Sequence, residues 1–314
     1  MVSLLNIGRT NRRMKMTVID EINQLKTQHN AVILAHNYVN GEIQDIADFC
    51  GDSLELSIKA KEVKAPVIVF CGVRFMAETA KLLSPDSIVL LPNSDAGCPM
   101  ADMADADEVA AFRKENPDSL LVAYVNSTAA VKANVDICCT SGNVEKVLNS
   151  IPAGKKVMFL PDRNLGGNMV NKLERSMELW RGYCPIHNKV TVEMITEARK
   201  AHPGAVVLVH PECQVEVIAA CDHALSTGGI LKYVRESAET EFIIGTECGI
   251  LHRLRKENPG KKFYPLQPEM ICTDMKKITL ENVRDCLKNM SEQIKLPEDL
   301  MKSAVRPIEA MLAL

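Results

Sequence analysis

The segment LVHPECQVEVIAACDHALSTGG, residues 208–229, contains a complete strand–helix–strand–helix order. An apolar strand ends at His210, helical spacing follows over Gln214–Cys221, a short strand is expected near Ala224, and a second helix starts from Thr227. Strands and helices that alternate across short turns are typical of a parallel sheet covered by helices on both faces. The segment therefore predicts an α/β fold.

The same order occurs in two earlier parts of the chain and continues after residue 229. Further strands are expected at Ala31–Ala35, Pro66–Phe70, Ile88–Leu91, Leu120–Ala123, Asp136–Cys139, Lys156–Leu160, Met177–Trp180, Glu241–Ile244 and Phe263–Leu266. Helices are expected after Gly51, near Thr128–Asn134, from Ser141 and at Gly249–Glu257. The chain thus contains three sets of similar elements.

Three groups of residues repeat with one period. The strand-end residues His36, Tyr124 and His210 are 88 and 86 residues apart, and Ser53, Ser141 and Thr227 each follow them by 17 residues. The cysteines Cys98, Cys184 and Cys272, each just after the last strand of a set, are 86 and 88 residues apart. The sequence therefore contains an internal repeat, which predicts a repeated architecture.

We expect three homologous three-layer αβα domains, each with a short parallel sheet, around a pseudo-threefold axis. The predicted domains span residues 17–98, 99–184 and 185–272, with an N-terminal extension at 1–16 and a C-terminal segment, 273–314, packed on the first domain. Ligands of open α/β sheets bind outside the carboxyl ends of the strands. The repeated positions are therefore expected to meet at one central cavity.

Composition excludes several classes of protein. The 314 residues carry a net charge of −3 and only 4% aromatic residues, which argues against a nucleic-acid partner. No apolar run of 18 residues is present, and residues 1–16 lack the features of a signal peptide, so neither a membrane span nor secretion is expected. We expect a cytoplasmic protein.

The eleven cysteines do not suggest a disulfide framework, because their number is odd and no secretory signal accompanies them. Most are expected to be buried core residues. Cys98, Cys184 and Cys272 differ because they occupy equivalent repeat positions, and we expect them to bind metal. Three thiolates on a [4Fe–4S] cluster would leave one iron open to act as a Lewis acid. The rival interpretation is a zinc site that adds His187.

Seven segments resemble the quinolinate synthase family. They are LAHNYVNGEIQDIADFCGDSLELS, NSDAGCPMADM, AYVNSTAAVKANVDICCTSGN, WRGYCPIH, LVHPECQVEVIAACDHALSTGG, GTECGILHRL and MICTDMKKITLENV, in order from about residue 31 to residue 283. The resemblance implies a [4Fe–4S] cluster with three Cys ligands, and condensation of iminoaspartate with dihydroxyacetone phosphate to quinolinate, phosphate and water in NAD biosynthesis. An L-aspartate oxidase or dehydrogenase would supply iminoaspartate. Some members carry C-x-x-C-x-x-C at the third ligand, but Cys272 stands alone here.

The resemblance also implies roles for site residues. Those expected to bind substrate carboxylates and help move protons are His36, Tyr38, Ser53, Tyr124, Asn126 and Ser141. His210, Ser226 and Thr227 are expected to bind the phosphate-bearing substrate, with helix N-terminal N–H groups assisting; simple helix capping is the alternative.

Glu212 is the expected general base, with a pKa raised by burial and Tyr38 as its partner. Its structural alternative is a carboxylate at the start of a helix. His187 and, more weakly, Glu247 are further candidates for the cavity wall.

Two other functions would use the same cysteines. An open-iron hydro-lyase acting on a hydroxy acid would need the same ligands. An iron–sulfur sensor would also hold a cluster, but it should carry a partner-binding face or a DNA-reading helix, and the sequence suggests neither.

Overall fold

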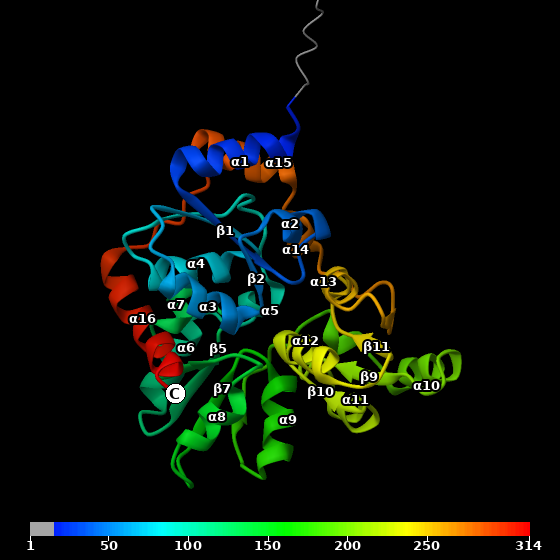
Figure 1. Ribbon diagram of the computed structural model, residues 1–314. Coiled ribbons are helices and arrows are strands. Elements are labelled where there is room, and N and C mark those ends of the chain that lie inside the picture. The colour runs from blue at the N-terminus through cyan, green and yellow to red at the C-terminus, as the bar shows by residue number, and fades with distance from the viewer. Residues whose placement is uncertain (1–15) are drawn as a thin grey trace, which may run out of the picture.

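The computed structural model describes residues 16–314, so the expected extension at 1–16 lies outside the described residues except for Met16. Within this range the chain forms three separate four-stranded parallel sheets (Figure 1). The strands are β1 (Ala31–His36), β2 (Phe49–Gly51), β3 (Val67–Cys71), β4 (Ile88–Leu90), β5 (Leu120–Tyr124), β6 (Ile137–Cys139), β7 (Val157–Leu160), β8 (Glu178–Leu179), β9 (Val206–Val209), β10 (His223–Ala224), β11 (Glu241–Gly245) and β12 (Lys262–Pro265). The predicted α/β class with three short parallel sheets is confirmed.

Helices connect and cover these strands. They are α1 (Val18–His29), α2 (Gly41–Ile46), α3 (Ser53–Glu62), α4 (Arg74–Leu83), α5 (Pro99–Asp102), α6 (Ala106–Glu115), α7 (Ala129–Lys132), α8 (Val144–Ser150), α9 (Arg163–Leu173), α10 (Val192–Ala201), α11 (Val215–Ala220), α12 (Thr227–Glu236), α13 (Ile250–Glu257), α14 (Thr273–Lys276), α15 (Leu280–Asn289) and α16 (Glu298–Leu312), with a 3₁₀ turn at His187–Lys189.

The three sheets share one strand order. They run β2-β1-β3-β4, β6-β5-β7-β8 and β10-β9-β11-β12, so the first strand of each set lies second in its sheet. The central strands are largely apolar and buried; all five residues of β3, for example, are buried. This is expected for parallel strands covered by helices on both faces. The repeat read from the sequence therefore corresponds to a repeated sheet topology.

A repeated aspartate fixes each sheet to the helix before it. Asp48, Asp136 and Asp222 accept backbone N–H groups of the preceding strand at 2.8, 2.8 and 2.7 Å, from Ile33, Leu121 and Val207. Each aspartate also pairs with a basic residue of the helix that precedes the unit: Lys26 at 2.8 Å, Arg113 at 2.6 Å and Arg199 at 3.0 Å. This contact was not predicted from the sequence, although the aspartate recurs 12 residues after each strand-end residue.

The helix expected from Ser141 begins later, at Val144. Residues 140–143 form a turn instead, in which Asn143 Oδ1 accepts the N–H of Thr140 at 2.7 Å and Thr140 Oγ1 accepts the N–H of Gly142 at 3.2 Å. Side chains of this type compete with the helix for backbone donors, so the turn persists and Ser141 lies before the helix.

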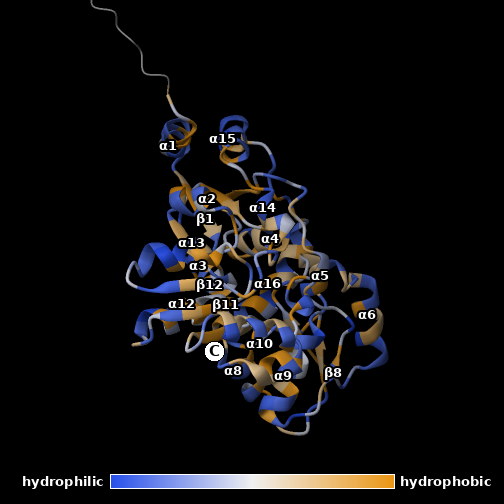
Figure 2. Cartoon of the chain, turned by 90° about the vertical axis from the view of Figure 1, so that its right-hand side faces the viewer, coloured by the Kyte–Doolittle hydropathy of each residue, from blue (hydrophilic) through white to orange (hydrophobic). Residues whose placement is uncertain are grey.

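The C-terminal segment contacts two of the units. Helix α15 packs against α1, beside the first sheet, and the two helices lie next to each other in both views, each with apolar and polar residues (Figures 1 and 2). Helix α16 packs against β6 and α7 and also reaches α4, burying Ala304, Ile308 and Met311. Residues 273–314 therefore join the first unit to the second. The domain boundaries expected from the sequence stay a prediction.

No helix among residues 16–314 combines the length and the apolar character needed to cross a membrane.

Candidate active site

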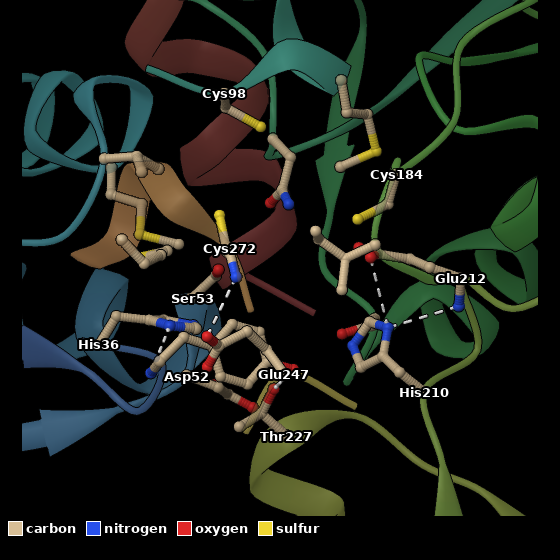
Figure 3. A pocket seen from close by; sticks show the side chains of 18 of the residues that line it. His36, Asp52, Ser53, Cys98, Cys184, His210, Glu212, Thr227, Glu247 and Cys272 are labelled. Atoms are coloured by element: carbon tan, nitrogen blue, oxygen red, sulfur yellow. Dashed lines mark hydrogen bonds and ion pairs between the residues drawn. The ribbon is translucent and has the colours of Figure 1, made fainter. Parts of the chain in front are cut away.

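A cavity of about 80 Å³ lies where the three units meet. The sequence-predicted residues in its wall are His36, Tyr38, Ser53, Cys98, Tyr124, Asn126, Ser141, Cys184, His187, His210, Glu212, Thr227, Glu247 and Cys272. Figure 3 labels His36, Ser53, Cys98, Cys184, His210, Glu212, Thr227, Glu247 and Cys272 among them. His36 and Tyr124 end β1 and β5, and His210 directly follows β9. The carboxyl ends of the three first strands thus point at one space, as ligand sites of open α/β sheets do.

All predicted site residues lie within residues 16–314, and among them Ser226 alone is not part of the cavity wall. It sits beside the cavity, where it is the N-cap of α12 and its Oγ accepts the N–H of Gly229 at 3.1 Å. Its hydroxyl is therefore used in holding the helix start.

The three cysteines enter the cavity from different units. Cys98 and Cys272 are the N-caps of α5 and α14, and Cys184 lies just before the 3₁₀ turn. Figure 3 shows their sulfur atoms directed into a common space. Every one of the eleven cysteines falls within residues 16–314 and is a free thiol. Three free thiols that face one cavity fit the donor set of an iron–sulfur cofactor.

Burial governs the ionisation of these thiols. It raises the pKa of Cys98 to about 12 and also raises the pKa values of Cys184 and Cys272. Cys272 raises the pKa of Cys98 further, because two thiolates close together repel each other. Without a cation the three groups are thiols at neutral pH. A bound metal would favour the thiolates, and its binding would release protons.

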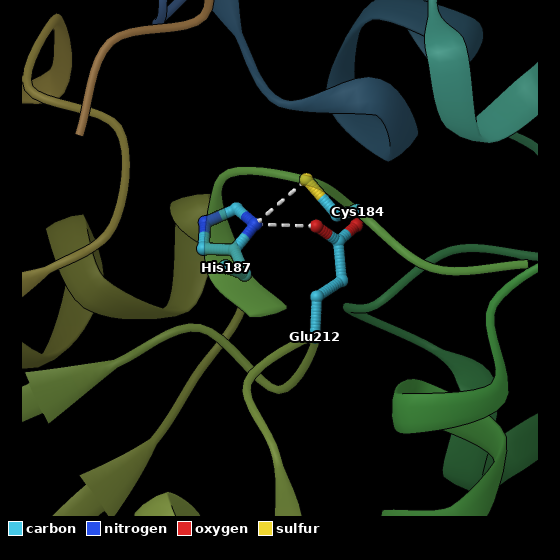
Figure 4. Close-up of side chains that lie close together, drawn as sticks. All are labelled: Cys184, His187 and Glu212. Atoms are coloured by element: carbon cyan, nitrogen blue, oxygen red, sulfur yellow. Dashed lines mark hydrogen bonds and ion pairs between the residues drawn. The ribbon is translucent and has the colours of Figure 1, made fainter. Parts of the chain in front are cut away.

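A second group of potential metal ligands consists of Cys184, His187 and Glu212, whose ligand atoms lie within 4.8 Å of one another (Figure 4). His187 Nδ1 is 2.6 Å from Glu212 Oε2 and 3.2 Å from Cys184 Sγ. Two ligands of one tetrahedral zinc ion would be about 3.3 Å apart, given bonds of about 2.0 Å to each. A separation of 2.6 Å is instead a hydrogen bond, so this group is better described as hydrogen-bonded than as a zinc site.

Glu212 is buried and accepts two hydrogen bonds. Tyr124 Oη donates to its Oε1 at 2.7 Å, and His187 Nδ1 lies 2.6 Å from its Oε2. Burial alone would raise the pKa of Glu212, but the imidazoles of His210 and His187 and these hydrogen bonds outweigh burial and lower the pKa. The expectation of a raised pKa was therefore wrong. Donors around a buried carboxylate stabilise its charged form.

A chain of hydrogen bonds joins Tyr38 to Glu212. Thr227 Oγ1 donates to Tyr38 Oη at 2.7 Å, Tyr38 Oη is 2.6 Å from Thr246 Oγ1, and Thr246 Oγ1 is 2.9 Å from His187 Nε2. His187 then contacts Glu212 through its other nitrogen. Tyr38 was expected to be the partner of Glu212, but Thr246, the residue that links them, was not predicted. Its position directly after β11, at the carboxyl end of a strand, was the available signal.

The two strand-end histidines have the same tautomer. The Nδ1 of His36 accepts the N–H of Tyr38 at 3.2 Å, and the Nδ1 of His210 accepts the N–H of Glu212 at 3.4 Å. In a neutral ring the hydrogen is then on Nε2. Burial lowers the pKa of His36 to about 3 and that of His210 to about 4, so both rings are neutral at pH 7. Both imidazoles can therefore donate from Nε2 without carrying charge.

The helix starts near the cavity hold fewer free N–H groups than the sequence suggested. Asp52, the N-cap of α3, accepts the N–H groups of Leu54 and Glu55 with one oxygen at 3.0 Å and that of Gly228 with the other at 3.1 Å. Because these amides already donate to a side chain of the protein, helix capping accounts for them better than anion binding does. The hydroxyls of Ser53, Ser141 and Thr227 remain in the cavity wall.

The side chain of Asn126 offers a further polar group to the cavity. Its Oδ1 is buried and has no hydrogen-bond partner in the structure. A buried acceptor without a partner costs free energy, which a bound donor would recover. Asn126 occupies the same repeat position as Tyr38 and Glu212, two residues after the strand end. The repeat thus places three different polar groups around one space.

Comparisons with known proteins agree with these features. A family model described as quinolinate synthetase A protein matches residues 20–313. A quinolinate synthase of Methanoregula boonei is 50% identical over 295 residues, which cover 94% of this chain and 97% of the relative. The quinolinate synthase of Thermodesulfovibrio yellowstonii is 49% identical over 297 residues, which cover 94% of this chain and 98% of the relative. That of Geobacter metallireducens is 47% identical over 298 residues, which cover 95% of this chain and 98% of the relative.

Proposed function

The chain belongs to the quinolinate synthetase A family, and we propose from this membership that it forms quinolinate for NAD biosynthesis. The observation that carries the proposal is the convergence of three thiols, one from each repeat, on a cavity that also holds Glu212 and two buried tyrosines. The family and the cysteine content of the chain are consistent with an iron–sulfur cofactor.

Cys98, Cys184 and Cys272 would hold a [4Fe–4S] cluster, and their place in the cavity wall supports this assignment. When bound through three protein ligands, such a cluster supplies an open iron, which is a Lewis acid. The remaining residues of the wall bind and orient the substrates and manage protons.

The proposed substrates are iminoaspartate and dihydroxyacetone phosphate, and the products are quinolinate, phosphate and water. Both substrates are anions, so hydrogen-bond donors should surround them. The neutral Nε2–H groups of His36 and His210 and the hydroxyls of Ser53 and Ser141 supply such donors, and they come from all three units. Thr227 is also in the wall, but its Oγ1 donates to Tyr38 Oη at 2.7 Å and would have to turn from that bond to bind the phosphate-bearing substrate. Ser226 would contribute indirectly, because its Oγ holds the first turn of α12, where Thr227 begins the helix.

The proton chemistry is divided between an ionised carboxylate and two neutral phenols. Glu212 is ionised because its pKa is lowered, and the same shift makes it a weak base. As the proposed base it would hold the proton taken from carbon next to a carbonyl only transiently, before the proton passes to a departing hydroxyl. Burial raises the pKa of Tyr38 and of Tyr124 well above the usual value, so both phenols keep their protons. They are the acids suited to departing hydroxyl or phosphate groups. The chain through Thr246 and His187 connects one of these acids to the base.

We propose that the protein works in the cytoplasm and receives iminoaspartate from an L-aspartate oxidase or dehydrogenase. Neither a nucleic acid nor a membrane is a proposed partner.

The test is anaerobic reconstitution with iron and sulfide, followed by an assay for quinolinate from the two proposed substrates. Variants Cys98→Ala, Cys184→Ala and Cys272→Ala should each lose both bound iron and quinolinate formation. Cys221→Ala is the matched control, because Cys221 is a half-buried thiol away from the cavity. Full activity in an iron-free preparation, or equal losses in the control, would refute the proposal.

A further inference from the structure

In two of the three cysteine loops, a carboxylate accepts a backbone N–H at or next to the cysteine. Glu247 Oε1 accepts the N–H of Cys272 at 3.1 Å, and Asp274 Oδ1 accepts the N–H of Gly97, beside Cys98, at 3.2 Å. In the second unit, Asp162 Oδ1 instead accepts the N–H groups of Asn164 and Leu165 at 2.8 and 3.0 Å, and its buried Oδ2 has no hydrogen-bond partner. Asp162 and Glu247 each follow the third strand of their unit within two residues. A carboxylate hydrogen-bonded to the backbone is thus common to the Cys98 and Cys272 loops.

Glu247 is the most fully engaged of these carboxylates. Its side chain is 1% exposed, and Lys276 Nζ lies 2.8 Å from Oε1. The N–H of Gly249 donates to Oε2 at 2.6 Å. Both oxygens are therefore occupied by donors from the protein. Glu247 thus lies in the cavity wall and ties the Cys272 loop to Lys276 and Gly249.

Lys276 extends the contact to another unit. Its Nζ also donates to the backbone carbonyl of Tyr38, and Asn40 Nδ2 donates to the carbonyl of Lys276 at 3.3 Å. One ion pair therefore connects the Cys272 loop of the third unit to the Tyr38 segment of the first. Gly249 lets the parts approach: a Cβ there would lie 2.7 Å from Glu247 Oε2, 2.8 Å from Lys276 Nζ and 2.8 Å from the carbonyl carbon of Tyr38.

We propose that Glu247 and Lys276 are positioning residues, which hold the Cys272 thiol and Tyr38 in fixed relation across the boundary between two units. The inference rests on the proposed function, because it takes Cys272 as a ligand of the cofactor. The physical reason is that metal ligands held by charged, hydrogen-bonded neighbours keep their orientation before the metal binds. Removing one partner of a buried ion pair leaves an unpaired charge, so the loop should move to solvate it.

The first experiment compares Glu247→Gln and Lys276→Met with wild type. A glutamine amide places N–H donors where Glu247 accepts from other donors, so the loop should shift. After anaerobic reconstitution, we expect a chelator to remove iron about ten-fold faster from each variant. In cluster-free protein, alkylation measured by mass spectrometry should accelerate at Cys272 while Cys98 and Cys184 keep their wild-type rates. The activity of iron-matched samples should fall in kcat more than it rises in KM.

The matched control is Glu241→Gln, which breaks the exposed ion pair with Lys262 on β11 and β12 of the same unit. It should leave chelation and alkylation unchanged. If Glu247→Gln does not fold, Gly249→Ala tests the same contact, because its added methyl must separate Glu247 from Lys276.

Unchanged chelation and Cys272 alkylation in folded variants would overturn the inference. So would faster alkylation of all three cysteines alike, which would indicate only general loss of stability. Cys272→Ala separates this result from failure of the proposed function. If that variant keeps its iron, ligation by Cys272 is wrong; if it loses iron while Glu247→Gln does not, positioning alone is wrong.

Discussion

Thr246→Val should uncouple Tyr38 from Glu212 while leaving the shape of the site intact. The hydroxyl of Thr246 is 2.6 Å from Tyr38 Oη and 2.9 Å from His187 Nε2, and the residue is 1% exposed. Valine has nearly the same volume, so the change removes two hydrogen bonds without opening a cavity. Tyr38 keeps its bond from Thr227, whereas His187 Nε2 loses the partner that fixes the ring.

The expected loss follows from these contacts. A buried polar group left without a hydrogen-bond partner costs about 1–3 kcal/mol. His187 Nε2 loses its partner completely, whereas the Tyr38 hydroxyl loses one of two, so we expect the free energy of unfolding to fall by about 2–4 kcal/mol. Displacement of a catalytic group by a fraction of an ångström to 1 Å, with loss of a proton route, should lower kcat about 100-fold. KM should change less, because neither lost bond is made to substrate.

The assay is anaerobic quinolinate formation with samples matched for iron content, alongside urea unfolding. Thr246→Ser restores the hydroxyl and should recover most of kcat. Thr79→Val is the control: Thr79 is also buried, but its Oγ1 donates only to the Phe75 carbonyl of its own helix, at 2.8 Å. Wild-type kcat in Thr246→Val, or an equal loss in the control, would refute the link between Tyr38 and Glu212.

Three further changes test other parts of the structure. Glu212→Gln should retain iron but lower kcat by about 10²–10⁴-fold, and iron-matched turnover equal to wild type would exclude it as base or anchor. Because the pKa of His210 is lowered to about 4, the unfolded chain binds a proton that the folded chain does not, so cluster-free protein should lose about 3 kcal/mol of stability between pH 6.5 and pH 4. In His210→Asn, the free energy of unfolding measured with urea should change less between pH 6.5 and pH 4 than it does in wild type. A pH dependence equal to that of wild type would contradict the assignment of this proton to His210. Asp136→Ala removes the N–H acceptor of Leu121 and the ion pair with Arg113. It should lower the free energy of unfolding by about 1–2 kcal/mol, with an unchanged KM; a raised KM would mean that the contact reaches the cavity.

The fold was readable from sequence because its determinants are local. Apolar runs mark the buried parallel strands, and capping residues such as Asp52 and Ser226 mark the helix starts. The repeat then placed the strand ends in equivalent positions without any knowledge of contacts. The helix start near Ser141 was misjudged because Thr140 and Asn143 bind their own turn, a competition too finely balanced for pattern alone.

The sequence by itself determined that the chain forms three α/β units and that His36, Tyr124 and His210 lie at the carboxyl ends of equivalent strands. It also determined that the three cysteines occupy equivalent positions. Only the tertiary structure decided which groups touch. Thr246 contacts Tyr38 across 208 residues and His187 across 59, and no local pattern encodes such a meeting. The tertiary structure also reversed the expected shift of the Glu212 pKa. Burial raises this pKa and hydrogen-bond donors lower it, and the balance depends on side chains that only folding brings together.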